Sequence, residues 1–341
     1  MGLAAIATRR RAAEAALVLL LGCGGSLLAA PRCAAEGAGL VLETKIPLGQ
    51  VSGRIDHLAV DLEHQRLFVA ELGNDAVGVI DLRGRQVLRT LSGLNDPQGV
   101  GYVPASDTLY VANAGDGSVR LFEGPELAPA GRIALDEDAD NVRVDEAADR
   151  VYVGYGNGAL AVIDAAKRVQ VADIRLDAHP EGFQLDPKSA RIFVNLPDAR
   201  QIAVVDRHIE KQIVGWQVPG VRGNFPMALD PAGRRIVLAF RRPARLVALA
   251  AVDGSVIANV ESCGDADDVF LDAKRQRIYL SCGEGFIDVF AVSDGYARIA
   301  RLPTPSGART SLFVPALDRF YLAVRASMSE PAAIWVYRPT P

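Results

Sequence analysis

Residues that could carry chemistry recur at one position along this 341-residue chain. Asp56 and His57 lie side by side in the segment GRIDHLAVD, at the start of a short apolar run. The residues equivalent to position 56 before six later apolar runs are Gln98, Asp140, Glu181, Phe225, Asp267 and Arg309. Those equivalent to position 57 are Gly99, Asn141, Gly182, Pro226, Asp268 and Thr310.

These positions combine carboxylates with a few cations. Packed carboxylates repel one another, so such a set holds a cation or a donor-rich ligand, or keeps some members protonated. Oxygen ligands suit Ca²⁺, Mg²⁺ or Mn²⁺, and one or two histidines, such as His57 and His179, move the preference toward Mn, Fe or Zn. Arg54 and Arg309 could instead pair with the acids or orient an anionic ligand.

We therefore predict two overlapping sets of site residues. The candidate ligand-binding ring is Asp56, His57, Gln98, Asp140, Asn141, Glu181, Asp267, Asp268 and Arg309. The candidate ligands of a divalent ion (Ca, Mg, Mn or Zn) are Asp56, His57, Asp140, Glu181 and Asp267.

A simpler interpretation stands beside this one. Asp, Asn, Gly and Pro form turns, and segments such as DADN, HPEG and GDADD all precede strands. Hydrogen bonds to loop backbone would then account for most of the acids. Turns alone give no reason to place acids at equivalent positions of successive units, however, and this regularity favours a ligand site.

The elements that must position these residues repeat. Seven segments have a central residue flanked by apolar residues: RLFVAE, TLYVAN, RVYVGY, RIFVNL, RIVLAF, RIYLSC and RFYLAV. Their central residues are 41 to 44 positions apart, at Phe68, Tyr110, Tyr152, Phe193, Val237, Tyr279 and Tyr321. A period of about 40–45 residues with four strands per unit is typical of a β-propeller blade. We therefore predict a seven-bladed, all-β propeller over residues 39–338, with four antiparallel strands per blade.

The last unit has only three strands of its own, TSLFV, RFYLAV and AIWVYR. The segment GLVLETKIPL, residues 39–48, precedes the first complete unit and can supply the fourth. This closure would pair the N-terminal strand with the last blade and remove free sheet edges. In a propeller the innermost strand of each blade begins beside the central channel, so positions 56 and its equivalents should form a ring around the axis.

The segment LYVAN and its six relatives resemble the YVTN-type β-propeller repeat, and the layout resembles the YncE-like exported bacterial proteins. The resemblance covers about residues 39–338 and implies the propeller fold. Propellers with this repeat serve binding, surface-layer and enzymatic roles, so the resemblance does not decide the function. A YncE-like protein is associated with single-stranded DNA binding, but no binding motif of that kind is found here.

Two cysteines lie at the same end of one predicted hairpin. Cys263 precedes the inner strand of the sixth unit, and Cys282 ends the strand antiparallel to it. We predict a disulfide between them, which an oxidising compartment would allow.

The N-terminus has the pattern of an export signal. Three arginines, residues 9–11, precede the apolar run AALVLLLG and then small residues up to Ala35. We predict a signal peptide over residues 1–35, with LLGC ending at Cys23 as an alternative lipobox. The protein would then be periplasmic or extracytoplasmic, touching a membrane only through such a lipid anchor, and we expect a monomer.

Charge and composition narrow the functions. The net charge is −4 and aromatic residues make up 6% of the chain, which argues against nucleic acid as a partner. The one basic cluster, in the fifth unit, is interpreted as a solvated face: Arg234, Arg235, Arg241, Arg242 and Arg245.

Three functions remain open. The first, which we favour, is an exported binding protein that uses the ring for a small polar ligand, a metal ion or a protein partner. The second is a metal-dependent hydrolase resembling the gluconolactonase propellers, whose ligand motif is not reproduced here. The third is single-stranded DNA binding, by the resemblance alone.

Overall fold

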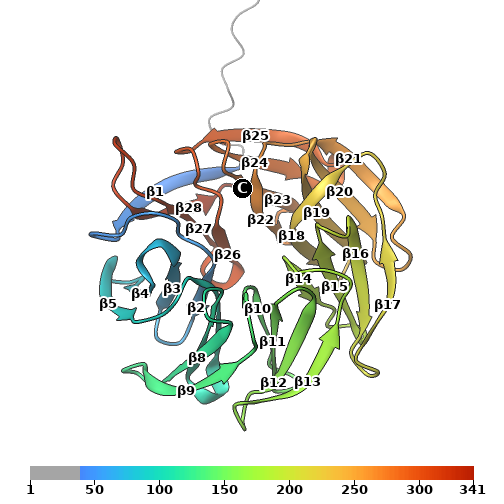
Figure 1. Ribbon diagram of the computed structural model, residues 1–341. Helices are drawn as coiled ribbons and strands as arrows, with labels where there is room; N and C mark the ends of the chain where they lie inside the picture. Colours follow the sequence, from blue (N-terminus) through green and yellow to red (C-terminus); the bar gives the residue numbers. More distant parts are fainter. Residues whose placement is uncertain (1–38) are drawn as a thin grey trace, which may run out of the picture. The chain divides into compact units, whose positions relative to one another are not determined.

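The computed structural model describes residues 39–341, which form seven four-stranded antiparallel sheets arranged around one axis (Figure 1). The predicted signal peptide, with its lipobox at Cys23, lies outside the described residues. No helix among residues 39–341 has the length and apolar character needed to cross a membrane.

Each blade runs from an inner strand at the axis to an outer strand at the rim. Blade 1 holds β2 (Leu58–Asp61), β3 (Arg66–Glu71), β4 (Ala76–Asp81) and β5 (Gln86–Ser92). Blade 2 holds β6 (Pro97–Val103), β7 (Thr108–Asn113), β8 (Ser118–Glu123) and β9 (Ala128–Ala134). Blade 3 holds β10 (Val142–Asp145), β11 (Arg150–Tyr155), β12 (Ala159–Asp164) and β13 (Val169–Arg175). Blade 4 holds β14 (Phe183–Leu185), β15 (Arg191–Leu196), β16 (Gln201–Asp206) and β17 (Lys211–Trp216).

The next two blades follow the same order. Blade 5 holds β18 (Arg222–Asp230), β19 (Arg235–Arg242), β20 (Ala244–Ala250) and β21 (Val256–Glu261). Blade 6 holds β22 (Ala266–Asp272), β23 (Arg277–Cys282), β24 (Phe286–Ala291) and β25 (Ala297–Pro303). Four short 3₁₀ turns complete the described structure, at Leu72–Asn74, Pro104–Ser106, Val292–Asp294 and Pro315–Leu317.

Blade 7 confirms the predicted closure. Its sheet has the order β1, β28, β27, β26, in which β1 (Leu40–Pro47) comes from the N-terminal side and β26 (Ser311–Val314), β27 (Arg319–Val324) and β28 (Ala333–Pro339) come from the end of the chain. Leu40 lies opposite Pro339, and the pairing continues to Pro47 opposite Ala333. The backbone N–H of Gly39 also donates a 3.0 Å hydrogen bond to the Thr340 side chain.

The core lies between the blades. The repeated segments form the second strand of each blade, and their central residues are at most 5% exposed. These strands are packed on both faces by neighbouring sheets, which explains why they read as continuous apolar runs. The rim strands, such as β5, have mostly exposed side chains instead. The seven packed interfaces hold the inner strands, and the residues that precede them, at fixed positions around the axis.

Candidate functional site

Backbone hydrogen bonds place the ring residues at equivalent positions. In three blades the N–H of the ring residue donates to a carbonyl at the end of the second strand: Asp56 to Ala70, Asp140 to Gly154 and Glu181 to Asn195, at 2.8–3.0 Å. The next N–H can also bridge to the neighbouring blade, as from His57 to the carbonyl of Gln98 and from Gly182 to that of Phe225. The acids are therefore in register because the inner hairpins extend beyond their regular strands.

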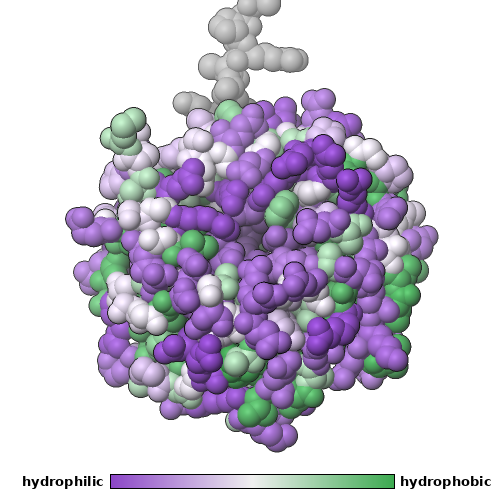
Figure 2. Space-filling view, viewed as in Figure 1, coloured by the Kyte–Doolittle hydropathy of each residue, from purple (hydrophilic) through white to green (hydrophobic). Residues whose placement is uncertain are grey.

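All seven residues at the ring position line one cavity of about 290 Å³: Asp56, Gln98, Asp140, Glu181, Phe225, Asp267 and Arg309. We call it the channel-mouth cavity. Its wall also includes Arg54, His57, Asp138, His179 and Arg241. The space-filling view shows a hollow near the axis, surrounded mostly by hydrophilic residues (Figure 2). The sequence therefore predicted correctly which residues converge, and their role in binding stays a prediction.

On one side of the channel-mouth cavity the acids are neutralised by arginines. Asp56 is 2% exposed and accepts a 2.6 Å hydrogen bond from Arg54. Asp267 lies 2.9 Å from Nε of Arg309 and also pairs with Arg241. Such hydrogen-bonded guanidinium–carboxylate pairs satisfy both partners and leave these acids little capacity for a further cation.

The opposite side is not neutralised. Asp140 is 5% exposed, and no hydrogen bond from residues 39–341 reaches its Oδ1 atom. The Glu181 carboxylate likewise has no hydrogen bond or arginine pair within the described residues. Burial, together with the repulsion between the two carboxylates, raises the pKa of Asp140 to about 8. Burial and the charge of Asp267 likewise raise the pKa of Glu181 to about 8. A cation placed here would remove the cause of both shifts.

His179 completes a set of potential metal ligands with these two acids. One ligand atom from each of Asp140, His179 and Glu181 lies within 4.8 Å of the others. The Nδ1 atom of His179 lies 2.6 Å from the carbonyl oxygen of Gly156 and donates to it. This bond fixes the tautomer and leaves Nε2 with a free lone pair, an arrangement common for histidines that bind metals. Two carboxylates and one imidazole suit Mn²⁺ or Zn²⁺.

A second layer lies below the ring. His57 is surrounded by three carboxylates, with Nε2 3.8 Å from Asp56 and 4.0 Å from Asp140, and Nδ1 3.7 Å from Asp268. Asn141 is 1% exposed and its Oδ1 has no hydrogen-bond partner among residues 39–341. Asp268 differs from the other acids, because its Oδ2 accepts the backbone N–H of Ser311 at 2.7 Å. Among the predicted ring acids, Asp268 is the one that acts on loop backbone.

Sequence reasoning did not identify Arg143, which lies in the channel with His57, Asn141 and Asp268. Its guanidinium donates to the carbonyl oxygens of Val142 and Phe183. Burial lowers its pKa, while the nearby charges of Asp268 and Asp140 oppose this shift. Arg143 stands three residues after the ring position, where the other blades have Ala59, Gly101, Gln184, Ala228, Phe270 and Leu312. Extending the alignment by three residues would have revealed the single charge in this layer.

The predicted basic cluster of blade 5 is wrong as a single solvated face. Arg235 opens β19 and pairs with Asp230, whereas Arg241 and Arg242 end that strand, so the arginines are split between its two ends. Arg241 lies in the wall of the channel-mouth cavity, 3.6 Å above the ring of Phe225. Apolar alternation of a strand does not distinguish a charge at its axial end from one in solvent, and this caused the error.

The predicted disulfide between Cys263 and Cys282 is confirmed, with Cα atoms 5.9 Å apart. Both cysteines are buried at the end of blade 6 that carries the ring, where Cys282 lies opposite Ala266. The bridge therefore fixes the segment that ends in Asp267 and Asp268.

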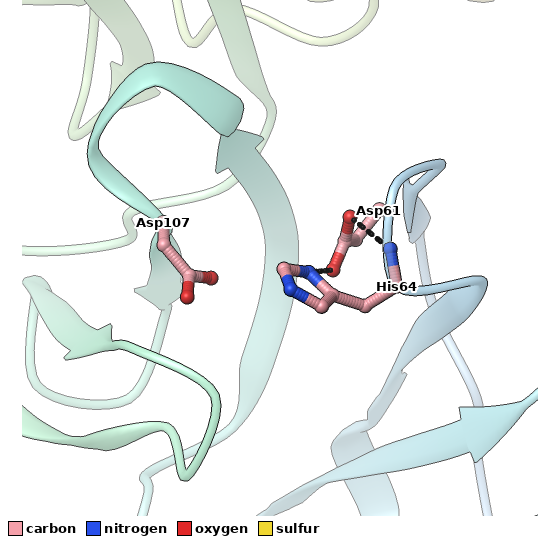
Figure 3. A group of neighbouring side chains, drawn as sticks. All are labelled: Asp61, His64 and Asp107. Carbon is pink, nitrogen blue, oxygen red and sulfur yellow. Dashed lines mark hydrogen bonds and ion pairs between the residues drawn. The ribbon is translucent and has the colours of Figure 1, made fainter.

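A second acidic group lies away from the axis, at the turn that leads from β2 to β3. Figure 3 shows Asp61 and His64 close together, with Asp107 across from them on the next blade. Asp61 lies 2.8 Å from Nδ1 of His64. Arg66 binds both acids, at 2.7 Å from Asp61 and 3.0 Å from Asp107. Because the arginine already neutralises both carboxylates, this group is an ion-pair network between blades rather than a metal site.

Fold and site together define a seven-bladed β-propeller with a polar cavity at one end of its channel. A solved chain described as Kuenenia stuttgartiensis hydrazine synthase is similar to it, with a TM-score of 0.73 and 15% identity over 84% of this chain and 97% of that one. This similarity supports the fold alone. No protein-family model and no curated protein matches the sequence, so the resemblance to YncE-like YVTN-repeat proteins stays a prediction.

Proposed function

We propose that this protein is an exported binding propeller whose channel-mouth cavity holds a divalent cation at Asp140, His179 and Glu181, and through it a small polar ligand. The observation that carries the proposal is the buried pair Asp140 and Glu181, which no arginine or lysine of the described chain neutralises although their counterparts Asp56 and Asp267 are both paired. Burying unpaired carboxylates is costly, so a bound cation supplies the missing charge.

The arginine-lined side favours a ligand with an electronegative end. Arg54 and Arg309 are half-buried and project into the same cavity as the proposed cation site. A small molecule could coordinate the cation through one oxygen and accept hydrogen bonds from these guanidinium groups through another. Export is supported by the N-terminal sequence pattern and by the Cys263–Cys282 disulfide, since such bonds persist in oxidising compartments.

A direct measurement of metal binding tests the proposal. The protein, purified without chelator and then stripped, is titrated calorimetrically with Zn²⁺, Mn²⁺ and Ca²⁺. We expect one ion per chain with the parent protein and at least a tenfold weaker affinity for the Asp140→Asn/Glu181→Gln variant. The matched control, Glu63→Gln/Asp198→Asn, removes two exposed acids and should bind as the parent does. Equal affinity in all three proteins would refute the cation site.

The same geometry favours a second candidate, a metal-dependent hydrolase. The cation pole faces arginines that could stabilise an oxyanion, and a divalent ion lowers the pKa of bound water. Turnover of lactone or ester substrates that disappears in the Asp140→Asn/Glu181→Gln variant would favour this activity over binding alone.

A further inference from the structure

A separate groove of about 670 Å³ opens on blades 4 and 5 beside the channel-mouth cavity. Arg200 in the β15–β16 turn, Arg222 at the start of β18 and Arg242 at the end of β19 line it. Arg241 lines both the groove and the channel-mouth cavity, so the two spaces share a wall. We call this space the arginine groove.

The three outer arginines of the groove are not neutralised. Arg241 binds Asp267 and lies 3.4 Å from Asp265, so its charge is balanced. By contrast, Arg200, Arg222 and Arg242 are exposed and have no ion pair or side-chain hydrogen bond within residues 39–341. Most other arginines at strand ends, such as Arg66, Arg207 and Arg275, have a carboxylate partner.

The strand register brings two of these charges together. Arg222 of β18 is the cross-strand partner of Arg242 of β19. Like charges directly opposite each other in an antiparallel pair are destabilising. The adjoining chain is also constrained, with Gly220 at φ 80° and Gly223 at φ 74°, a backbone conformation that side chains other than glycine rarely adopt. An anion between the arginines would convert their repulsion into attraction.

We propose that the arginine groove binds a phosphate-type oxyanion, either free or as the phosphoryl group of a small organic molecule. Guanidinium groups donate two parallel hydrogen bonds to such an anion, and three of them around one open space match its several oxygens. Because Arg241 separates the groove from the channel-mouth cavity, the rest of a phosphorylated ligand can extend toward the axis. The proposal goes beyond the cation site and does not require it.

Titration at low ionic strength with two probes tests the proposal. One probe is inorganic phosphate and the other is glucose 6-phosphate, each followed by calorimetry with the full chain. We expect both to bind the parent protein, and the Arg222→Gln/Arg242→Gln variant to bind them at least tenfold more weakly. Tighter binding of the sugar phosphate would identify an organic ligand, and equal binding would identify the free anion, both in support of the groove.

Matched variants separate this site from loss of folding and from the cation site. The control Arg83→Gln/Arg120→Gln removes two arginines of blades 1 and 2 and should bind both probes as the parent does. Arg222→Lys keeps the charge but loses the paired donors, and we expect an intermediate affinity. The Zn²⁺ affinity of the Arg222→Gln/Arg242→Gln variant should be unchanged, which also shows that the variant is folded. No phosphate binding by the parent, equal binding by the variant, or salt-sensitive binding of an oligonucleotide alone would overturn the proposal.

Discussion

The Oδ1 atom of Asp140 lies 4.0 Å from Nε2 of His57, and no hydrogen bond from residues 39–341 reaches this buried oxygen. The imidazole is thus too far away to satisfy the carboxylate, although it lies between three acids. A propeller channel with this arrangement has a local excess of negative charge beside arginines that are already engaged with other acids.

The first prediction concerns pH. The pKa values of Asp140 and Glu181 are raised to about 8 in the folded protein, so between about pH 4 and 8 the folded state binds more protons than the unfolded state. The associated stability is present at low pH and is lost as the pH rises through 8. For the metal-free protein we expect a loss of about 1–3 kcal/mol, measured by urea unfolding at pH 5 and pH 8.5.

The Asp140→Asn/Glu181→Gln variant serves as the control for this pH effect, because it has no carboxyl groups to ionise at these positions. Its unfolding free energy should change less between the two pH values than that of the parent. An identical pH dependence in both proteins would show that the two carboxyls ionise normally.

The second prediction concerns the ion pairs between blades 1 and 2. Arg66→Gln would leave Asp61, which is 1% exposed, without its cation and would remove the link to Asp107. Breaking a buried pair by removing one partner costs about 3–5 kcal/mol, and we expect a decrease of this order in the free energy of unfolding. His64→Gln should leave Zn²⁺ affinity unchanged, and reduced affinity would mean that this network binds the metal.

The third prediction concerns the disulfide. Replacing Cys263 and Cys282 together by serine should lower the free energy of unfolding by about 3 kcal/mol, because the unfolded chain loses a closed loop. The cation affinity should fall by a smaller factor than in the Asp140→Asn/Glu181→Gln variant, since the bridge supports blade 6 while the proposed ligands lie on blades 3 and 4. Thermal melts and Zn²⁺ titrations measure the two effects, and unchanged stability would contradict the role assigned to the bridge.

The fourth prediction concerns blade closure. A chain starting at residue 48 lacks β1 and exposes the β28 edge, which pairs with β1 from Leu40 to Pro47. We expect it to be much less stable than a chain starting at residue 37 and to aggregate, since an unpaired edge strand templates association. Circular dichroism melts and size-exclusion chromatography compare the two chains, and equal melting temperatures would argue against the closure as a source of stability.

The sequence predicted the fold because each blade repeats a buried second strand, and the spacing from Phe68 to Tyr321 is set by the four strands that one sheet needs. It also predicted which residues meet at the axis, since equivalent positions in a ring of blades must converge. It could not predict which acids are neutralised. Whether Asp267 meets Arg241 and Arg309, while Asp140 meets no arginine, depends on side chains that reach across from neighbouring blades.

The pairing of Leu40 with Pro339 has a further consequence for the order in which the molecule can form. β1 leaves the ribosome before any blade, yet its only sheet partner, β28, is the last strand to be made. Blade 7 can therefore assemble only after the whole chain is available, whereas blades 1 to 6 consist of neighbouring segments that can pair as they appear. For nearly the entire time of synthesis β1 must remain an unpaired strand, and its many exposed and charged side chains, including Glu43 and Lys45, help to keep it soluble while it waits.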